Sequence, residues 1–213
     1  MRELCRDAAR QPTSLKLEQW ASMLLGAFWE RRELAGGPWS ADLVAVVGEP
    51  FLEGIARVGS PAAKVALLTL ARLDRGELAP RARELADGLA GSVPRRVTDV
   101  GTARLVEALV AASPGDGEAV LLRSDAVGAC GHMLVVWIDE RHRRIAKHVA
   151  LIRPDALAEM TSGLKLRSAD LATTCRKVAK AIKRTDMAAN PPVNESFSQY
   201  RAIALARLSP LER

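Results

Sequence analysis

The segment from His132 to Arg153 constrains the fold more than any other part of the chain. Its run Met133–Ile138 is unbroken apolar sequence rich in β-branched residues, which is typical of a short strand buried on both faces. Ile145–Ile152 is a second, mainly apolar segment that could pair with it, and a basic stretch separates the two. The segment therefore predicts a β-hairpin, which we expect helices to cover on one or both faces.

A second hairpin is predicted upstream of the first. Ser113-Pro-Gly-Asp-Gly117 is the strongest turn signal in the chain, and the apolar segments Leu105–Ala111 and Ala119–Arg123 flank it. The second flank is predicted to be a strand. Residues 103–112 also contain good helix formers, so helix stays an alternative there, but an apolar partner across a Gly-Asp-Gly turn favours a strand.

Helical patterns dominate the chain before this region. Ser14 is placed to cap a helix with an apolar stripe at three- and four-residue spacing, ending at Gly36-Gly37-Pro38. Ser60 followed by Pro61 is typical of a helix start. Similar signals predict short helices over 3–10, 40–47, 50–58 and 80–89, so residues 1–92 are interpreted as a helical layer.

Helices also follow the predicted hairpins. Pro154 opens one to about Met160, Ser168 begins one that runs to Arg184, and Ser196 with Gln199 suggests a capping box for a last helix through Leu208. The predicted fold is α+β, with a helical N-terminal layer (1–92) followed by a small antiparallel sheet of two hairpins packed with helices (93–213). One continuous domain is the alternative to this division.

Positive charge is concentrated in the last third of the chain. The net charge is +6, but residues 140–184 hold 12 Lys and Arg against 4 Asp and Glu, a local balance of +8. In the helix after Ser168, Leu171, Cys175, Val178 and Ile182 form an apolar stripe, and the cations project away from it. The predicted basic surface consists of Arg141, Arg143, Arg144, Arg176, Lys177, Lys180, Lys183 and Arg184.

A local basic field attracts acidic partners. The first hypothesis is therefore a non-enzymatic interaction or regulatory module whose basic face binds an acidic protein. Nucleic-acid binding by the same face is the alternative, although the region has few aromatic residues to stack on bases and no recognisable reader motif.

A third hypothesis is a hydrolase-type enzyme that uses His132 or His148. If the hairpin turn is centred on Arg141-His142, Asp139 faces Arg144 and Val135 faces His148. In that register the three histidines are scattered over two faces and the tip of the hairpin, so an enzyme is the less favoured hypothesis. We assign no catalytic residue from the sequence.

Cofactor and metal sites are not predicted either. No segment matches a phosphate loop or a dinucleotide fingerprint. Cys5, Cys130 and Cys175 are far apart and form no Cys-x-x-Cys pair, so a site combining Cys130 with His132 and His148 is disfavoured. The N-terminus lacks a secretory signal and no apolar run is long enough to span a membrane, so we expect a cytoplasmic protein that does not bind membranes.

One resemblance covers roughly residues 98–208. The order of a Gly-Asp-Gly turn, a strand ending Val-Trp-Ile-Asp139, an Ala146-Lys147 step, a basic helix, Pro191-Pro192 and Tyr200-Arg201 resembles a group of uncharacterised proteins from high-GC Gram-positive (actinobacterial) bacteria. The resemblance implies a similar domain plan and bacterial origin. It implies no activity, cofactor or site residue.

Overall fold

The structure is a computed structural model that describes residues 1–31, 44–74, 76–113, 117–125, 132–141 and 143–209. The chain forms two compact units, residues 1–101 and 102–213. The first is helical, and the second combines an antiparallel sheet with helices. The predicted α+β fold is confirmed.

The N-terminal unit is arranged around one central helix. Its elements are α1 (Arg2–Arg10), α2 (Ser14–Glu30), the π-helical turn η2 (Val44–Gly48), α4 (Glu49–Ala56), α5 (Pro61–Leu73), α6 (Leu78–Asp87) and α7 (Arg95–Thr98). The central helix α5 contacts α1, α2, α4, α6 and α7. Most of its apolar residues are accordingly buried, including Val65, Leu67 and Leu70.

The residues that cap the helices can be compared with the caps predicted from the sequence. The Ser60 hydroxyl accepts a hydrogen bond from the Ala63 amide at 3.2 Å, so Ser60 caps α5 as predicted. The cap assigned to Ser14 was wrong by one residue, because Thr13 accepts from the Lys16 amide instead. The predicted Gly36–Pro38 stop lies outside the described residues. The helical unit extends to residue 101 because α7 packs against α2 and α5.

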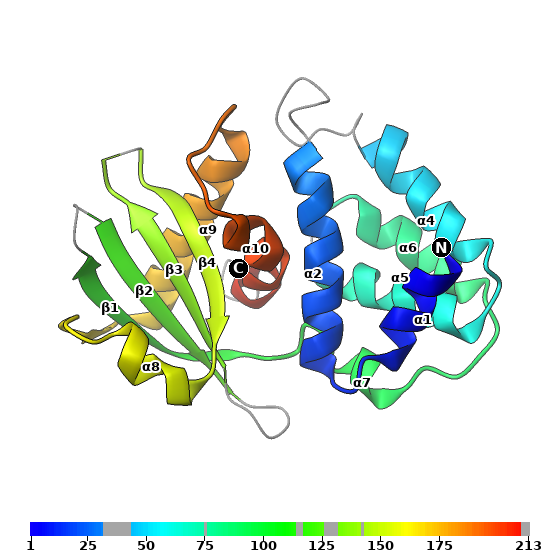
Figure 1. Ribbon diagram of the computed structural model, residues 1–213, viewed down its shortest axis with the longest axis horizontal. Coiled ribbons are helices and arrows are strands. Elements are labelled where there is room, and N and C mark those ends of the chain that lie inside the picture. Colours follow the sequence, from blue (N-terminus) through cyan, green and yellow to red (C-terminus); the bar gives the residue numbers. More distant parts are fainter. Residues whose placement is uncertain (32–43, 75, 114–116, 126–131, 142, 210–213) are drawn as a thin grey trace. The chain divides into compact units, whose positions relative to one another are not determined.

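The sheet of the C-terminal unit contains both predicted hairpins. Its strands are β1 (Leu105–Ser113), β2 (Gly117–Ser124), β3 (Met133–Asp139), β4 (Ile145–Ile152) and β5 (Arg167–Ala169). All neighbours are antiparallel, in the order β4-β3-β2-β1-β5 (Figure 1). Residues 105–113 are thus a strand, as favoured. The sequence did not reveal β5, which begins where a helix start was expected and pairs with only Ala108–Val110 of β1.

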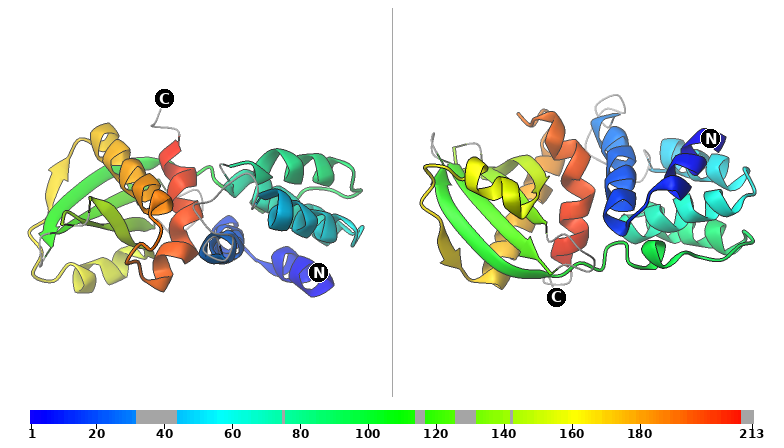
Figure 2. Two further views of the ribbon diagram at one scale, coloured as in Figure 1. Left: turned by 90° about the horizontal axis from the view of Figure 1, so that it is seen from above. Right: turned by 60° about the horizontal axis from the view of Figure 1, so that its bottom comes forward.

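Three helices complete this unit: α8 (Pro154–Met160), α9 (Leu171–Met187) and α10 (Glu195–Leu208). Figure 2 shows α8 and α9 on opposite faces of the sheet. On the α8 side, Leu121, Val135 and Ile152 form a core with Leu157 packed against it. Because side chains alternate along strands, Val120, Leu122, Leu134 and Val136 are buried on the other face. Burial on both faces is why β3 is apolar without interruption.

The last two helices are tied to each other and to β4. Arg201 of α10 makes two hydrogen bonds to the Asp186 carboxylate of α9, both at 2.6 Å. α10 also packs on β4 and α9. The predicted capping box at Ser196 was wrong, because the residue at the cap position is Asn194 and Ser196 lies in the first turn of the helix.

Candidate partner-binding surface

α9 has one buried face and one exposed face. The residue that caps its N-terminus is Asp170, whose carboxylate accepts a hydrogen bond from the Thr173 amide at 2.8 Å. Hydrogen bonds from Thr173 hold the pKa of Asp170 below its usual value. Cys175, Val178 and Ile182 are fully buried on the sheet side. The predicted apolar stripe therefore places α9 against the sheet, and this leaves the cations on the solvent side.

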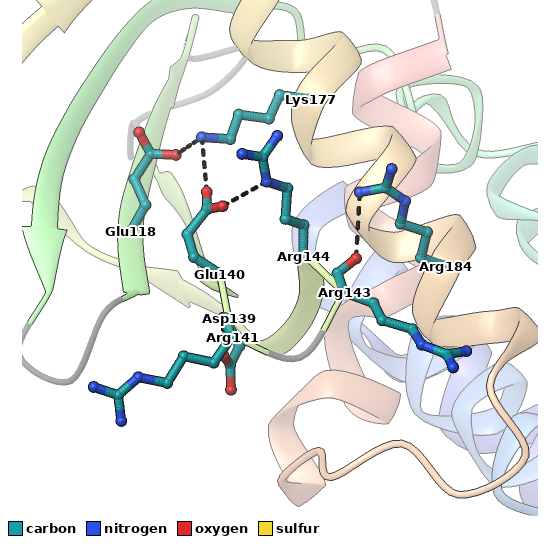
Figure 3. A network of polar contacts seen from close by, with 8 residues as sticks. All are labelled: Glu118, Asp139, Glu140, Arg141, Arg143, Arg144, Lys177 and Arg184. Carbon is teal, nitrogen blue, oxygen red and sulfur yellow. Dashed lines mark hydrogen bonds and ion pairs between the residues drawn. The ribbon is translucent and has the colours of Figure 1, made fainter.

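The predicted cations of α9 fall into two groups. Arg176, Lys180 and Lys183 are exposed. Lys177 and Arg184 are only half exposed, because they lie on the flank of the helix that faces the β3–β4 hairpin (Figure 3). From the sequence, all five are equivalent surface charges, and only their tertiary contacts distinguish the two groups.

Lys177 is the centre of a charge network between α9 and the hairpin. Its ammonium group pairs with the Glu118 carboxylate of β2 and lies 3.3 Å from the Glu140 carboxylate at the end of β3 (Figure 3). Glu140 also pairs with Arg144 at 2.6 Å. Two cations thus meet two carboxylates here, so Lys177 and Arg144 add little to the net positive field of this region.

Arg184 contacts the hairpin tip in a different way. Its guanidinium donates a hydrogen bond to the carbonyl oxygen of Arg143 at 3.3 Å. Arg143 and Arg144 both have φ near 57°, a left-handed conformation that is unfavourable for side chains of this size. The acceptor of Arg184 is neutral, so this contact fixes the backbone of the tip without neutralising the positive charge of Arg184.

The hairpin tip supplies the remaining predicted residues. Arg141, Arg143 and Arg144 are all exposed, and the Arg141 amide donates to the Asp139 carboxylate at 2.9 Å. The structure therefore brings the tip and α9 together. The sequence indicated both as basic but contained no signal for the contacts between them.

The register predicted for this hairpin was wrong. Asp139 pairs with Ile145 instead of Arg144, so the pairing is already displaced by one residue next to the turn. A β-bulge at Lys147 adds a second residue, so Trp137 pairs with His148. The Lys147 ammonium pairs with the Asp139 carboxylate, although the predicted register put these side chains on opposite faces. The displacement next to the turn accounts for this, because it moves Lys147 to the face of Asp139. This ion pair lies at the base of the hairpin tip.

The two histidines that the structure describes, His132 and His148, do not converge. The partner of His148 in the sheet is Trp137, five residues along β3 from His132, or about 16 Å at roughly 3.3 Å per residue. His142 lies outside the described residues. The sequence-based expectation that the hairpin scatters its histidines therefore agrees with the positions of the two that are described.

His148 instead joins a polar cluster at the start of α10. Its Nδ1 atom contacts the Asn194 amide and lies 2.9 Å from the Ser196 hydroxyl, while its ring meets Trp137 edge-on at 4.6 Å between centroids. Burial lowers the pKa of His148 below its usual value, against the opposing effect of the Asn194 contact. The cluster attaches the start of α10 to β4, since the backbone amide of Asn194, distinct from the side-chain amide that contacts His148, donates to the Lys147 carbonyl at 3.2 Å.

The described cysteines are buried. Burial raises the pKa of the Cys175 thiol to about 11 and also raises that of Cys5. Cys130 lies outside the described residues. Among the residues that the structure describes, no group of three or more His, Cys, Asp or Glu side chains is placed to hold a metal ion.

Within the described part of the chain, no helix combines the length and apolar character needed to cross a membrane. Comparison of the chain with protein families, curated proteins and solved structures found no match.

Proposed function

We propose that this protein is an interaction module that binds an acidic protein partner through a basic face. The basic face consists of Arg176, Lys180, Lys183 and Arg184 of α9 with Arg141 and Arg143 at the hairpin tip. The single observation that carries the proposal is the exposure of Arg176, Lys180 and Lys183 on the side of α9 that faces away from the sheet.

The way in which the sheet holds α9 and the hairpin tip supports this proposal. The buried side of α9 packs on the sheet, and the Arg184 hydrogen bond holds the hairpin tip beside the helix. Cations carried by a packed helix require less ordering of the backbone on binding than cations on a disordered segment, so binding costs less conformational entropy. Clustered charge of one sign also accelerates encounters with a partner of opposite charge and disfavours basic partners.

Charge reversal on α9 tests the proposal. The triple variant Arg176→Glu, Lys180→Glu and Lys183→Glu should lose the proteins that the wild-type chain recovers from a nuclease-treated host lysate. The matched control reverses Arg2, Arg6 and Arg10, three exposed cations of α1, and so changes the net charge equally. We expect this control to retain the partners.

Two results would contradict the proposal. Recovery of the same proteins by both variants would show that the basic face is not used. Loss of all recovered proteins on nuclease treatment, with binding of nucleic acid that weakens steeply as salt increases, would assign the face to nucleic acid instead.

A further inference from the structure

The exposed residues of α9 follow a regular spacing. Within Leu171–Met187, the exposed residues are Thr173, Arg176, Lys180, Lys183 and Met187. Their separations are three, four, three and four residues. At 3.6 residues per turn, this alternation places them in one line along the helix, the same spacing by which two helices pack side by side.

This line, here called the α9 stripe, changes character along its length. It begins with Thr173, continues with three cations, and ends with Met187, which is 78% exposed. Fourteen residues separate its ends, or about 21 Å at roughly 1.5 Å per residue. The row therefore presents three cations followed by one exposed apolar side chain.

We infer that the partner presents an acidic α-helix that lies along the α9 stripe. This inference rests on the proposed function and adds the geometry of the partner. Carboxylates spaced three and four residues apart on that helix would meet Arg176, Lys180 and Lys183, and an apolar side chain near one of its ends would cover Met187.

Spacing favours a helix over an extended segment. From Arg176 to Lys183 the axial separation is about 10.5 Å, and a partner helix repeats the same rise and periodicity. Alternate side chains of a strand recur about every 6.7 Å, so three of them span about 13 Å and fall out of step with the cations. The mismatch grows with each further contact.

Met187 favours a protein over a nucleic acid. Its thioether gains by burial against apolar atoms, which a phosphate backbone does not offer. Exposed ion pairs contribute little individually and are screened by salt. We therefore expect the methionine contact to matter for specificity as much as any single cation.

Fluorescence anisotropy with the full chain and three labelled peptides tests the inference. The first peptide is a four-turn helix with glutamates on a three-four spacing and a leucine at each end, so that either direction of approach can meet Met187. The second has the same composition with the glutamates spread around the helix. The third places a proline in the centre of the first, which breaks the helix.

The first peptide should bind at least about tenfold more tightly than the other two, a difference that such measurements resolve readily. Met187→Ser should weaken its binding about threefold or more, while Met23→Ser, at another exposed methionine, should not. Equal binding of all three peptides would overturn the helical partner. If charge reversal on α9 then abolished that binding, the proposed function would stand.

A different result would defeat both proposals. If the triple charge reversal at Arg176, Lys180 and Lys183 left the affinity for the first peptide unchanged, neither the basic face nor the α9 stripe would be the binding surface. Circular dichroism of the peptides and of each protein variant separates loss of binding from loss of structure.

Discussion

The Thr185 hydroxyl oxygen of α9 lies 3.0 Å from both the backbone nitrogen and the carbonyl oxygen of Ala146 in β4. β4 is at one edge of the sheet, where outward-facing backbone groups lack a strand partner. The carbonyl oxygen of the next residue, Lys147, accepts a hydrogen bond from the backbone amide of Asn194. The Thr185 hydroxyl of α9 and the Asn194 backbone amide, just before α10, thus form hydrogen bonds with backbone groups of this edge strand. These bonds help to hold α9 and α10 against β4.

Removing the Thr185 hydroxyl should destabilise the C-terminal unit. Thr185→Val keeps the side-chain volume but leaves the buried Ala146 amide without its acceptor, which costs about 1–3 kcal/mol. Thr185→Ser retains the hydroxyl and should cost less. Urea denaturation of both variants measures the difference, and equal stabilities would show that the hydroxyl is not needed.

Acid should weaken the attachment of α10 through His148. The pKa of His148 is lower in the folded chain than its ordinary value of about 6.5, so the unfolded chain binds the proton more readily. Its contribution to stability is present above about pH 6.5 and is lost as the pH falls through the folded-state pKa. His148→Leu should flatten this part of the pH profile.

Urea midpoints measured from about pH 7.5 to about pH 5, the range in which histidines titrate, provide the comparison for wild type and His148→Leu. Ser196→Ala is a useful second variant, because it removes one contact at Nδ1 while leaving the histidine. Identical pH profiles for wild type and His148→Leu would mean that His148 does not contribute to acid sensitivity.

Removing a neutralising carboxylate should strengthen binding to an acidic partner. Glu140→Gln releases both Lys177 and Arg144 from their shared carboxylate. We expect the affinity for the first peptide, the helix with glutamates on a three-four spacing, to increase about threefold. The gain should be smaller at high salt, because exposed charges are screened. The stability cost should stay below about 1 kcal/mol, as for other exposed ion pairs.

Glu159→Gln is the matched control for that experiment. Glu159 is an exposed carboxylate on α8, on the opposite face of the sheet, and its replacement changes the net charge by the same amount. An equal gain from both variants would indicate a general charge effect and would count against a role for the network around Lys177.

Cys175 should be unreactive in the folded chain. Its thiol is fully buried and its pKa is raised to about 11, so almost none is present as the reactive thiolate near neutral pH. Iodoacetamide labelling followed by peptide mapping should modify Cys175 only after denaturation. Modification under native conditions would show that α9 separates from the sheet on the time scale of the reaction.

Local sequence patterns predicted most of the secondary structure. The apolar runs of β3 and β4, the turn signal between β1 and β2, and the Ser60-Pro61 helix start all act within a few residues of the chain. The β5 strand was missed because three residues of polar or small character, Arg167–Ala169, become a strand only by pairing with β1. Its signal is not local.

The candidate surface shows the same division. The sequence alone determined that α9 is amphipathic, with an apolar side and a row of cations, because helical periodicity fixes which side chains share a face. Tertiary structure decided which of those cations remain exposed. In the sequence, Lys177 looks the same as the neighbouring cations of α9. In the structure its charge is neutralised by Glu118, which lies 59 residues earlier in the chain, and by Glu140, which lies 37 residues earlier.

The hairpin register was also decided in three dimensions. The predicted register puts Asp139 and Lys147 on opposite faces, but the pairing next to the turn is displaced by one residue, which brings the two side chains together. The bulge at Lys147 then displaces the pairing by a second residue. The sequence by itself determined that strands and a basic helix form. Only tertiary packing determined where the strand register shifts and which charged side chains form ion pairs, because both depend on contacts between residues that local sequence patterns do not specify.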